Sequence, residues 1–115
     1  MSITESEAKI VLEVWSVLLR ITLEEAGQIL GVSAGTIESW LNNQLPIPPE
    51  FLGRIKSTDA SLSRVQDLIK KASLADVIRR PAEVFGGQTA LDWILAGRIK
   101  DVADAYDEGL YFQPD

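Results

Sequence analysis

The stretch TLEEAGQILGVSAGTIESW, residues 22–40, decides the expected fold. Thr22 followed three residues later by Glu25 is a capping box, a pair of side chains that typically begins a helix. Gly31 can end that helix, because glycine readily adopts a left-handed backbone conformation. Ser33 can then cap a second helix. The stretch therefore predicts two short helices joined by a tight turn.

Small and apolar residues in this stretch fall at the spacing that a helix-turn-helix requires. Gly27 has no side chain, so we expect the two helices to cross closely there. Four apolar side chains are expected to fill the space between them: Leu23, Leu30, Ile37 and Trp40. The second helix is expected to end near Asn42, before a segment with three prolines in four residues.

Helical periodicity extends along the rest of the chain, and no segment alternates as a strand does. From Glu5 to Arg20 the apolar residues recur at helical spacing: Ile10, Val11, Val14, Trp15, Val17 and Leu18. Further helices are expected from Pro48 or Pro49, over the apolar stripe at 62–69, from Ser73, over 89–95 and over 98–108. We expect a linker near Ser57-Thr58-Asp59. The predicted fold is all-α, with a helix-turn-helix domain over 1–58 and a small helical domain over 59–115.

The 115-residue chain contains neither cysteine nor histidine. Their absence excludes disulfides and thiolate metal sites, and it removes the commonest metal ligands and the commonest general base. We therefore expect no enzymatic activity, no cofactor and no metal. The chain opens without a basic, apolar signal segment, and no apolar run reaches the roughly 20 residues of a membrane span, so a cytoplasmic location without membrane contact is expected.

Two segments resemble binding sites but are better interpreted as ordinary structure. Phe85-Gly-Gly-Gln-Thr89 resembles a phosphate-binding loop but lacks the Gly-Lys-Ser/Thr ending and follows no predicted strand, so we interpret Gly86-Gly87 as a turn. The carboxylates of Asp101, Asp104 and Asp107 would be spread along a helix, which favours a solvated face over a cation site.

The predicted surface for DNA carries no lysine or arginine. Its candidate DNA-contacting residues are Ser33, Gly35, Glu38, Ser39, Asn42 and Asn43. Asparagine can pair with adenine and glutamate can accept from cytosine, so base contacts are chemically feasible. The net charge of −6 opposes attraction to phosphates. Residues 1–47 carry two basic and six acidic groups, and residues 75–115 carry four basic and eight acidic groups. Binding to operator DNA therefore stays an open question, and a basic protein is the partner that this charge favours.

The two halves together resemble the Xre/MbcA/ParS antitoxins and their toxin-binding domain. The likeness rests on the helix-turn-helix, on Ile78-Arg-Arg-Pro81, on FGGQTALDWIL at 85–95, on the Gly97-Arg98 turn and on a last helix ending in DEGLYF at 107–112. Nearly the whole chain is covered. Ala90 stands where the family often has proline, and the recognition helix here is uncharged.

The resemblance implies a type II antitoxin that binds and blocks a RES-type, NAD-consuming toxin and represses its own operon. A pocket that holds a pyrophosphate should be basic, so an acidic helix with an aromatic tip suits it by charge and shape. The expected toxin-binding residues are Asp104, Asp107, Glu108, Leu110, Tyr111 and Phe112.

Two alternatives stay open beside the antitoxin. One is a stand-alone helix-turn-helix transcriptional regulator, whose second half dimerises or senses a ligand. The other is an adaptor that has lost DNA binding and only joins proteins. We expect the chain to form a homodimer or a hetero-oligomer with the toxin.

Overall fold

A computed structural model describes residues 3–69 and 73–108, and its regular elements are helices. In chain order they are α1 (Glu5–Leu18), α2 (Leu23–Leu30), α3 (Ala34–Leu41), α4 (Pro49–Ile69), α5 (Leu74–Val77), the 3₁₀ helix η1 (Glu83–Phe85), α6 (Ala90–Leu95) and α7 (Ile99–Asp107). The only strand-like pairing among these residues is an isolated bridge between Pro81 and Thr89. The predicted all-α class is confirmed for the described residues.

The local signals around α2 and α3 act as the sequence predicts. The Thr22 hydroxyl accepts a hydrogen bond from the backbone N–H of Glu25, and the Glu25 carboxylate accepts from the backbone N–H of Thr22. Gly31 ends α2 with φ of 77°, in the left-handed region. Ser33 caps α3 by accepting from the Thr36 N–H at 3.1 Å. These contacts join residues three or four apart, so α2 and α3 follow from the local sequence.

The close approach expected at Gly27 has a different origin from the one predicted. A Cβ atom at Gly27 would lie 2.3 Å from the carbonyl oxygen of Val32, in the turn after α2. The crowding therefore comes from the turn, where the Val32 N–H donates to the Gly27 carbonyl at 2.8 Å. Of the four expected filling residues, Leu30, Ile37 and Trp40 are buried, whereas Leu23 is half-buried.

The linker expected at residues 57–59 is wrong, because α4 runs through it without a break. Serine, threonine and aspartate have modest intrinsic helix propensity, but no proline or glycine interrupts them, and tertiary contacts override propensity. Thr58 is 9% exposed on the same face as Ile55 and Leu62. Asp59 accepts a hydrogen bond from the Trp15 indole N–H at 3.1 Å, which joins α4 to α1.

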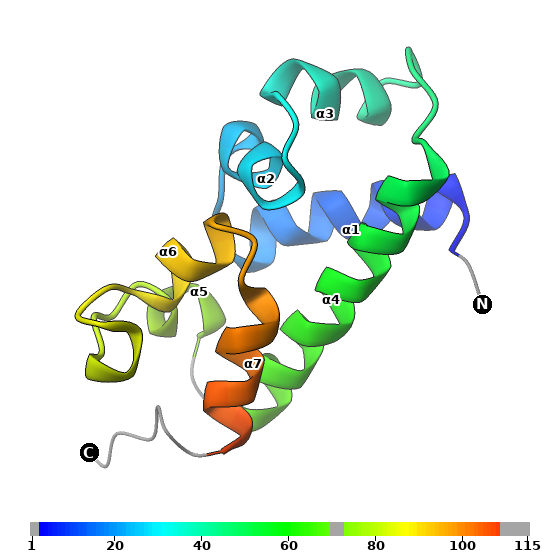
Figure 1. Cartoon of the computed structure of the whole chain (residues 1–115). Coiled ribbons are helices and arrows are strands. Elements are labelled where there is room, and N and C mark those ends of the chain that lie inside the picture. The colour runs from blue at the N-terminus through cyan, green and yellow to red at the C-terminus, as the bar shows by residue number, and fades with distance from the viewer. Residues whose placement is uncertain (1–2, 70–72, 109–115) are drawn as a thin grey trace.

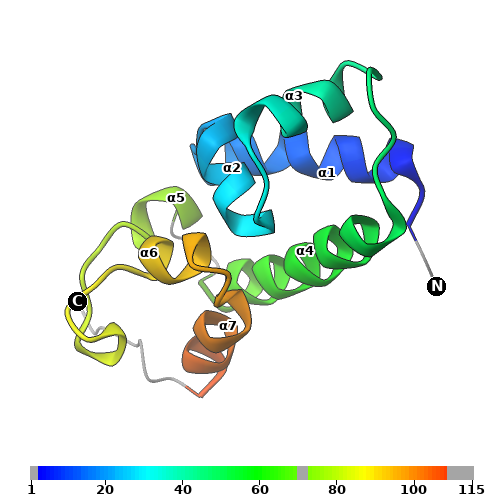
Figure 2. The ribbon, with the colours of Figure 1, turned by 45° about the horizontal axis from the view of Figure 1, so that its top comes forward.

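The helix α4 packs against helices from both halves of the chain (Figure 1). Both views show α1 beside its first half and α7 beside its second half, in agreement with the contacts between these helices (Figure 2). One cluster of buried apolar side chains draws on every α-helix from α1 to α7. The boundary expected between residues 58 and 59 falls inside α4, so the two predicted domains share this helix, and the division itself stays a prediction.

The turn expected at Gly86-Gly87 is confirmed. Both glycines have left-handed φ angles, of 66° and 83°, and the Gly87 N–H donates to the Ala82 carbonyl at 3.0 Å. The turn sets Phe85 against Trp93 of α6, with ring centroids 4.8 Å apart. This loop therefore interrupts the helical chain between α5 and α6, and it covers the core there.

Candidate functional site

The six candidate DNA-contacting residues lie on α3, at its N-cap, which is Ser33, and in the turn that follows it. Gly35, Glu38 and Asn42 are exposed at spacings of three and four, so they share one face of the helix. Ser39 is half-buried, and Asn43 is exposed with φ of 61°. Three of the six predicted residues, Gly35, Glu38 and Asn42, therefore share an exposed face.

Two polar side chains of the predicted set, those of Ser33 and Asn43, are already engaged locally. The Ser33 hydroxyl caps α3 and also hydrogen-bonds the Thr36 hydroxyl at 2.9 Å. The Asn43 side-chain oxygen accepts from the ammonium group of Lys9, which comes from α1. No lysine or arginine lies on α3 itself. The free groups left for base contacts are those of Glu38, Ser39 and Asn42, and the attraction of this face for phosphate is weak.

The acidic end of α7 is held by a cation that the sequence analysis missed. Nη2 of Arg64, on α4, lies 3.6 Å from Oδ1 of Asp104 and 3.4 Å from Oδ2 of Asp107. Both carboxylates remain about half exposed, and Glu108 at the end of the helix is exposed and forms no ion pair with the other described residues. Arg64 is 40 residues from Asp104, so only the packing of α7 on α4 reveals the pairing.

The rest of the predicted toxin-binding surface, Leu110, Tyr111 and Phe112, lies outside the described residues. Asp101, the first acid of the α7 face, accepts from Nε of Arg98 at 2.9 Å. Within residues 3–69 and 73–108 no three metal-ligating side chains gather at one point. The acids of α7 are paired with two different cations, Asp101 with Arg98, and Asp104 and Asp107 with Arg64.

An exposed apolar stripe runs along α1, on the side of the helix that the core does not cover. Ile10, Val14 and Val17 are 61%, 47% and 81% exposed. The buried side of α1 consists of Ala8, Leu12 and Trp15, with Leu19 just beyond the helix. The sequence offers apolar residues on both sides of α1, so periodicity alone could not decide which side the core would cover.

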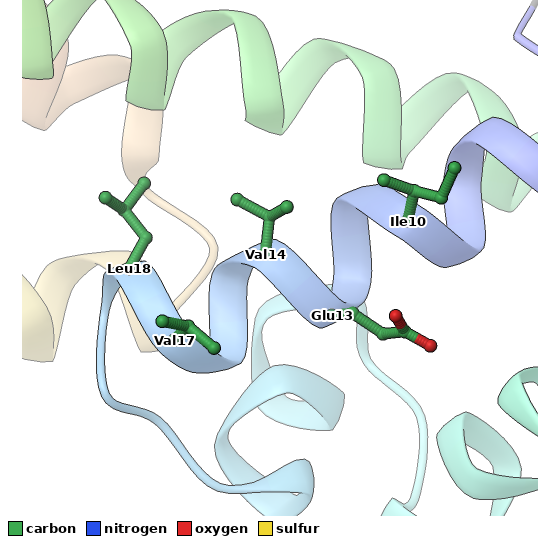
Figure 3. Close-up of a pocket in the computed structure, with 5 residues that line it drawn as sticks. All are labelled: Ile10, Glu13, Val14, Val17 and Leu18. Atoms are coloured by element: carbon green, nitrogen blue, oxygen red, sulfur yellow. The ribbon is translucent and has the colours of Figure 1, made fainter.

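Figure 3 shows the stripe on successive turns of α1, with Glu13 and Leu18 beside it. These five residues outline a depression of about 420 Å³. All of them come from one helix, so the depression is a shallow surface and not an enclosed cavity. Contiguous exposed apolar residues commonly mark surfaces for association with proteins.

A second, more polar pocket of about 540 Å³ opens between α2, α4 and the turn from α6 to α7. Its wall contains Arg54, Ser57, Thr58 and Ser61 from α4 and Lys100 from α7. The sequence analysis missed this pocket, because its residues are brought together only by the tertiary structure.

Comparisons with protein-family models, with curated protein sequences and with solved structures find no match. The resemblance to the antitoxins therefore rests on the residues quoted for it. Within the described part of the chain, every helix is too short or too polar to cross a bilayer.

Proposed function

We propose that this protein is an antitoxin of the Xre/MbcA/ParS type, which binds a RES-type toxin through the end of α7 and the residues after it. The observation that carries the proposal is the group of exposed carboxylates at this end, Asp104, Asp107 and Glu108. A toxin pocket that binds the pyrophosphate of NAD must be basic, so complementary charge steers this end toward it. The resemblance over nearly the whole chain adds independent support.

The contacts of Arg64 are compatible with such a role. Exposed ion pairs contribute about 0–1 kcal/mol, so Asp104 and Asp107 can exchange Arg64 for a cation of the toxin at small cost. Until then Arg64 orients both carboxylates on the same side of α7. Leu110, Tyr111 and Phe112 would add apolar contact area, and aromatic residues are typical hot spots of interfaces. Blocking a pocket in this way requires no chemical step from the antitoxin.

Co-expression with a RES-type toxin tests the proposal. Replacing Asp104, Asp107 and Glu108 by the corresponding amides should weaken toxin binding by at least about tenfold and reduce protection of growth. Deleting 109–115 should do the same. A matched control replaces Glu24, Glu50 and Glu83, which are exposed acids on other helices, and should bind as the original chain does. Undiminished protection by both site variants would overturn the proposal.

A stand-alone transcriptional regulator is the second candidate, favoured by the capped helix α3 with Gly35, Glu38 and Asn42 exposed on one face. A regulator of this kind should bind a palindromic DNA site in the absence of a toxin, and this binding should depend on salt concentration. The substitution Asn42→Ala should weaken it. A stable complex with the toxin that shifts no DNA would instead support the adaptor. The location in the cytoplasm that this function requires is part of the same proposal.

We also propose that the chain forms a homodimer through the α1 stripe. Ile10, Val14 and Val17 have the spacing i, i+4, i+7 of a helix-packing seam. Ile10 lies four residues before Val14 and Val17 three residues after it, so an antiparallel pair related by a two-fold axis would set Ile10 of one copy near Val17 of the other. Such self-complementarity is what a two-fold interface needs.

A further inference from the structure

We propose that the polar pocket between α2, α4 and the α6–α7 turn binds a phosphate-type oxyanion carried by a small soluble molecule. This site is separate from the acidic end of α7, and it goes beyond the antitoxin function. Its volume of about 540 Å³ lies within the usual range of small-molecule pockets, roughly 300–1,000 Å³.

The wall supplied by α4 is a stripe of hydrogen-bond donors. Arg54, Ser57, Thr58 and Ser61 follow the spacing i, i+3, i+4, i+7, so they line one face of the helix. Gln28 of α2 adds an amide to the same pocket. This face presents a guanidinium and three hydroxyls to the pocket, with Arg54 and Ser57 exposed, Ser61 half-buried and Thr58 buried.

The charge of the pocket is the opposite of that of the whole chain. Arg54 and Lys100 both line it, and no aspartate or glutamate does, although the chain carries a net charge of −6. Nη1 of Arg54 donates to the Leu30 carbonyl at 3.2 Å, which fixes the guanidinium beside the pocket and leaves its other N–H groups for a ligand. Lys100 forms no ion pair with the other described residues and can turn toward an anion.

The first turn of α7 adds a favourable dipole. The N–H groups at the start of a helix have no partner within it and attract anions. Arg98, the residue before α7, supplies no side-chain cap, and Ile99 and Lys100 of this turn line the pocket. Asp101 is close by in sequence but does not line the pocket, and it is paired with Arg98.

Thr58 adds a further hydrogen-bond donor to the pocket. It lines the pocket, it is only 9% exposed, and its hydroxyl forms no hydrogen bond with any other residue in the described ranges 3–69 and 73–108. The hydroxyl oxygen itself keeps some contact with solvent, so it can donate to a ligand in the pocket. An oxyanion in the pocket would accept from Thr58, from its neighbours Ser57 and Ser61, and from the two cations.

Titration of the full chain with inorganic phosphate and with adenosine monophosphate, followed by backbone amide NMR signals, tests the proposal. We expect saturable shifts for residues 57–61 and 97–100. Lys100→Gln should weaken binding by about tenfold, since a hydrogen bond to a charged group contributes roughly that much. Lys9→Gln, which removes the same charge from α1, should leave the affinity within about twofold of the original, because exposed distant charges are screened.

Three results would overturn the proposal. The first is the absence of saturable shifts with either probe at millimolar concentration. The second is binding that Lys100→Gln and Lys9→Gln weaken equally, which would indicate general attraction of anions. The third is a duplex oligonucleotide that shifts these signals when phosphate and adenosine monophosphate do not, which would assign the pocket to a nucleic-acid backbone. None of these readouts uses the toxin, so failure here is distinguishable from failure of the antitoxin proposal.

Discussion

The geometry of the α2–α3 turn depends on Gly27. Its carbonyl accepts from the N–H groups of both Gly31 and Val32, so the chain folds back over the end of α2. The space for a side chain at Gly27 is already occupied by the Val32 carbonyl oxygen. Backbone atoms cannot move aside as the end of a flexible side chain can, and a larger residue must distort the turn.

Gly27→Ala should therefore lower the free energy of unfolding by about 1–3 kcal/mol, the usual cost of overpacking. Urea denaturation measures the change. Gly35→Ala is the matched control, since the nearest atom to its Cβ is the Ser33 hydroxyl oxygen at 3.8 Å. In α3 this substitution should raise stability by up to about 1 kcal/mol, because alanine is the better helix former. Equal effects of the two substitutions would contradict the proposed clash.

At the level of the element, α1 has two apolar sides, and only one of them packs against the core. Ala8, Leu12 and Trp15 lie in the core at 1% exposure or less, and Trp15 also donates to Asp59. The opposite side carries the stripe of Ile10, Val14 and Val17. The fold leaves this side uncovered because α4 and α2 meet α1 only on its buried side.

Val17→Lys should abolish dimer formation while it changes the free energy of unfolding of the monomer by less than about 0.5 kcal/mol, as is usual for exposed positions. Light scattering over a concentration series, with urea denaturation of the same samples, measures both effects. Leu45→Lys is the matched control, since Leu45 is 50% exposed outside α1. A wild-type chain that stays monomeric throughout the series would refute the dimer.

For the whole molecule, the packing of α7 on α4 determines whether the two halves of the chain behave as one unit. Buried apolar residues of both helices belong to the common core, among them Leu62 of α4 and Val102 of α7. Arg64 adds ion pairs to Asp104 and Asp107 at the surface. Burial of apolar area is the larger contribution, because the ion pairs are solvated and screened.

Leu62→Ala should lower the free energy of unfolding by about 2–5 kcal/mol, whereas Arg64→Gln should lower it by less than about 1 kcal/mol. Thermal and urea unfolding of both variants provide the comparison, and high salt should not alter the effect of Leu62→Ala. A larger loss for Arg64→Gln would show that the surface pairs, and not the core, hold α7 in place. Far-ultraviolet circular dichroism checks that both variants remain helical before unfolding.

The sequence by itself determined the positions of α2, α3, α6 and α7 to within a few residues. Thr22 with Glu25, Ser33 with Thr36, and Thr89 with Asp92 are contacts between near neighbours, so they form in any surroundings that admit a helix. The left-handed turns at Gly31 and Gly86-Gly87 are local for the same reason.

Only the tertiary structure decided what each helix covers and which charges meet. The indole of Trp15 reaches Asp59 across 44 residues, so α4 continues where local composition predicted a linker. The exposure of the α1 stripe, the pairing of Arg64 with the α7 carboxylates and the cationic pocket at Arg54 and Lys100 likewise join distant segments. Burial and electrostatic pairing depend on neighbours in space, whereas caps and turns depend on neighbours in the chain.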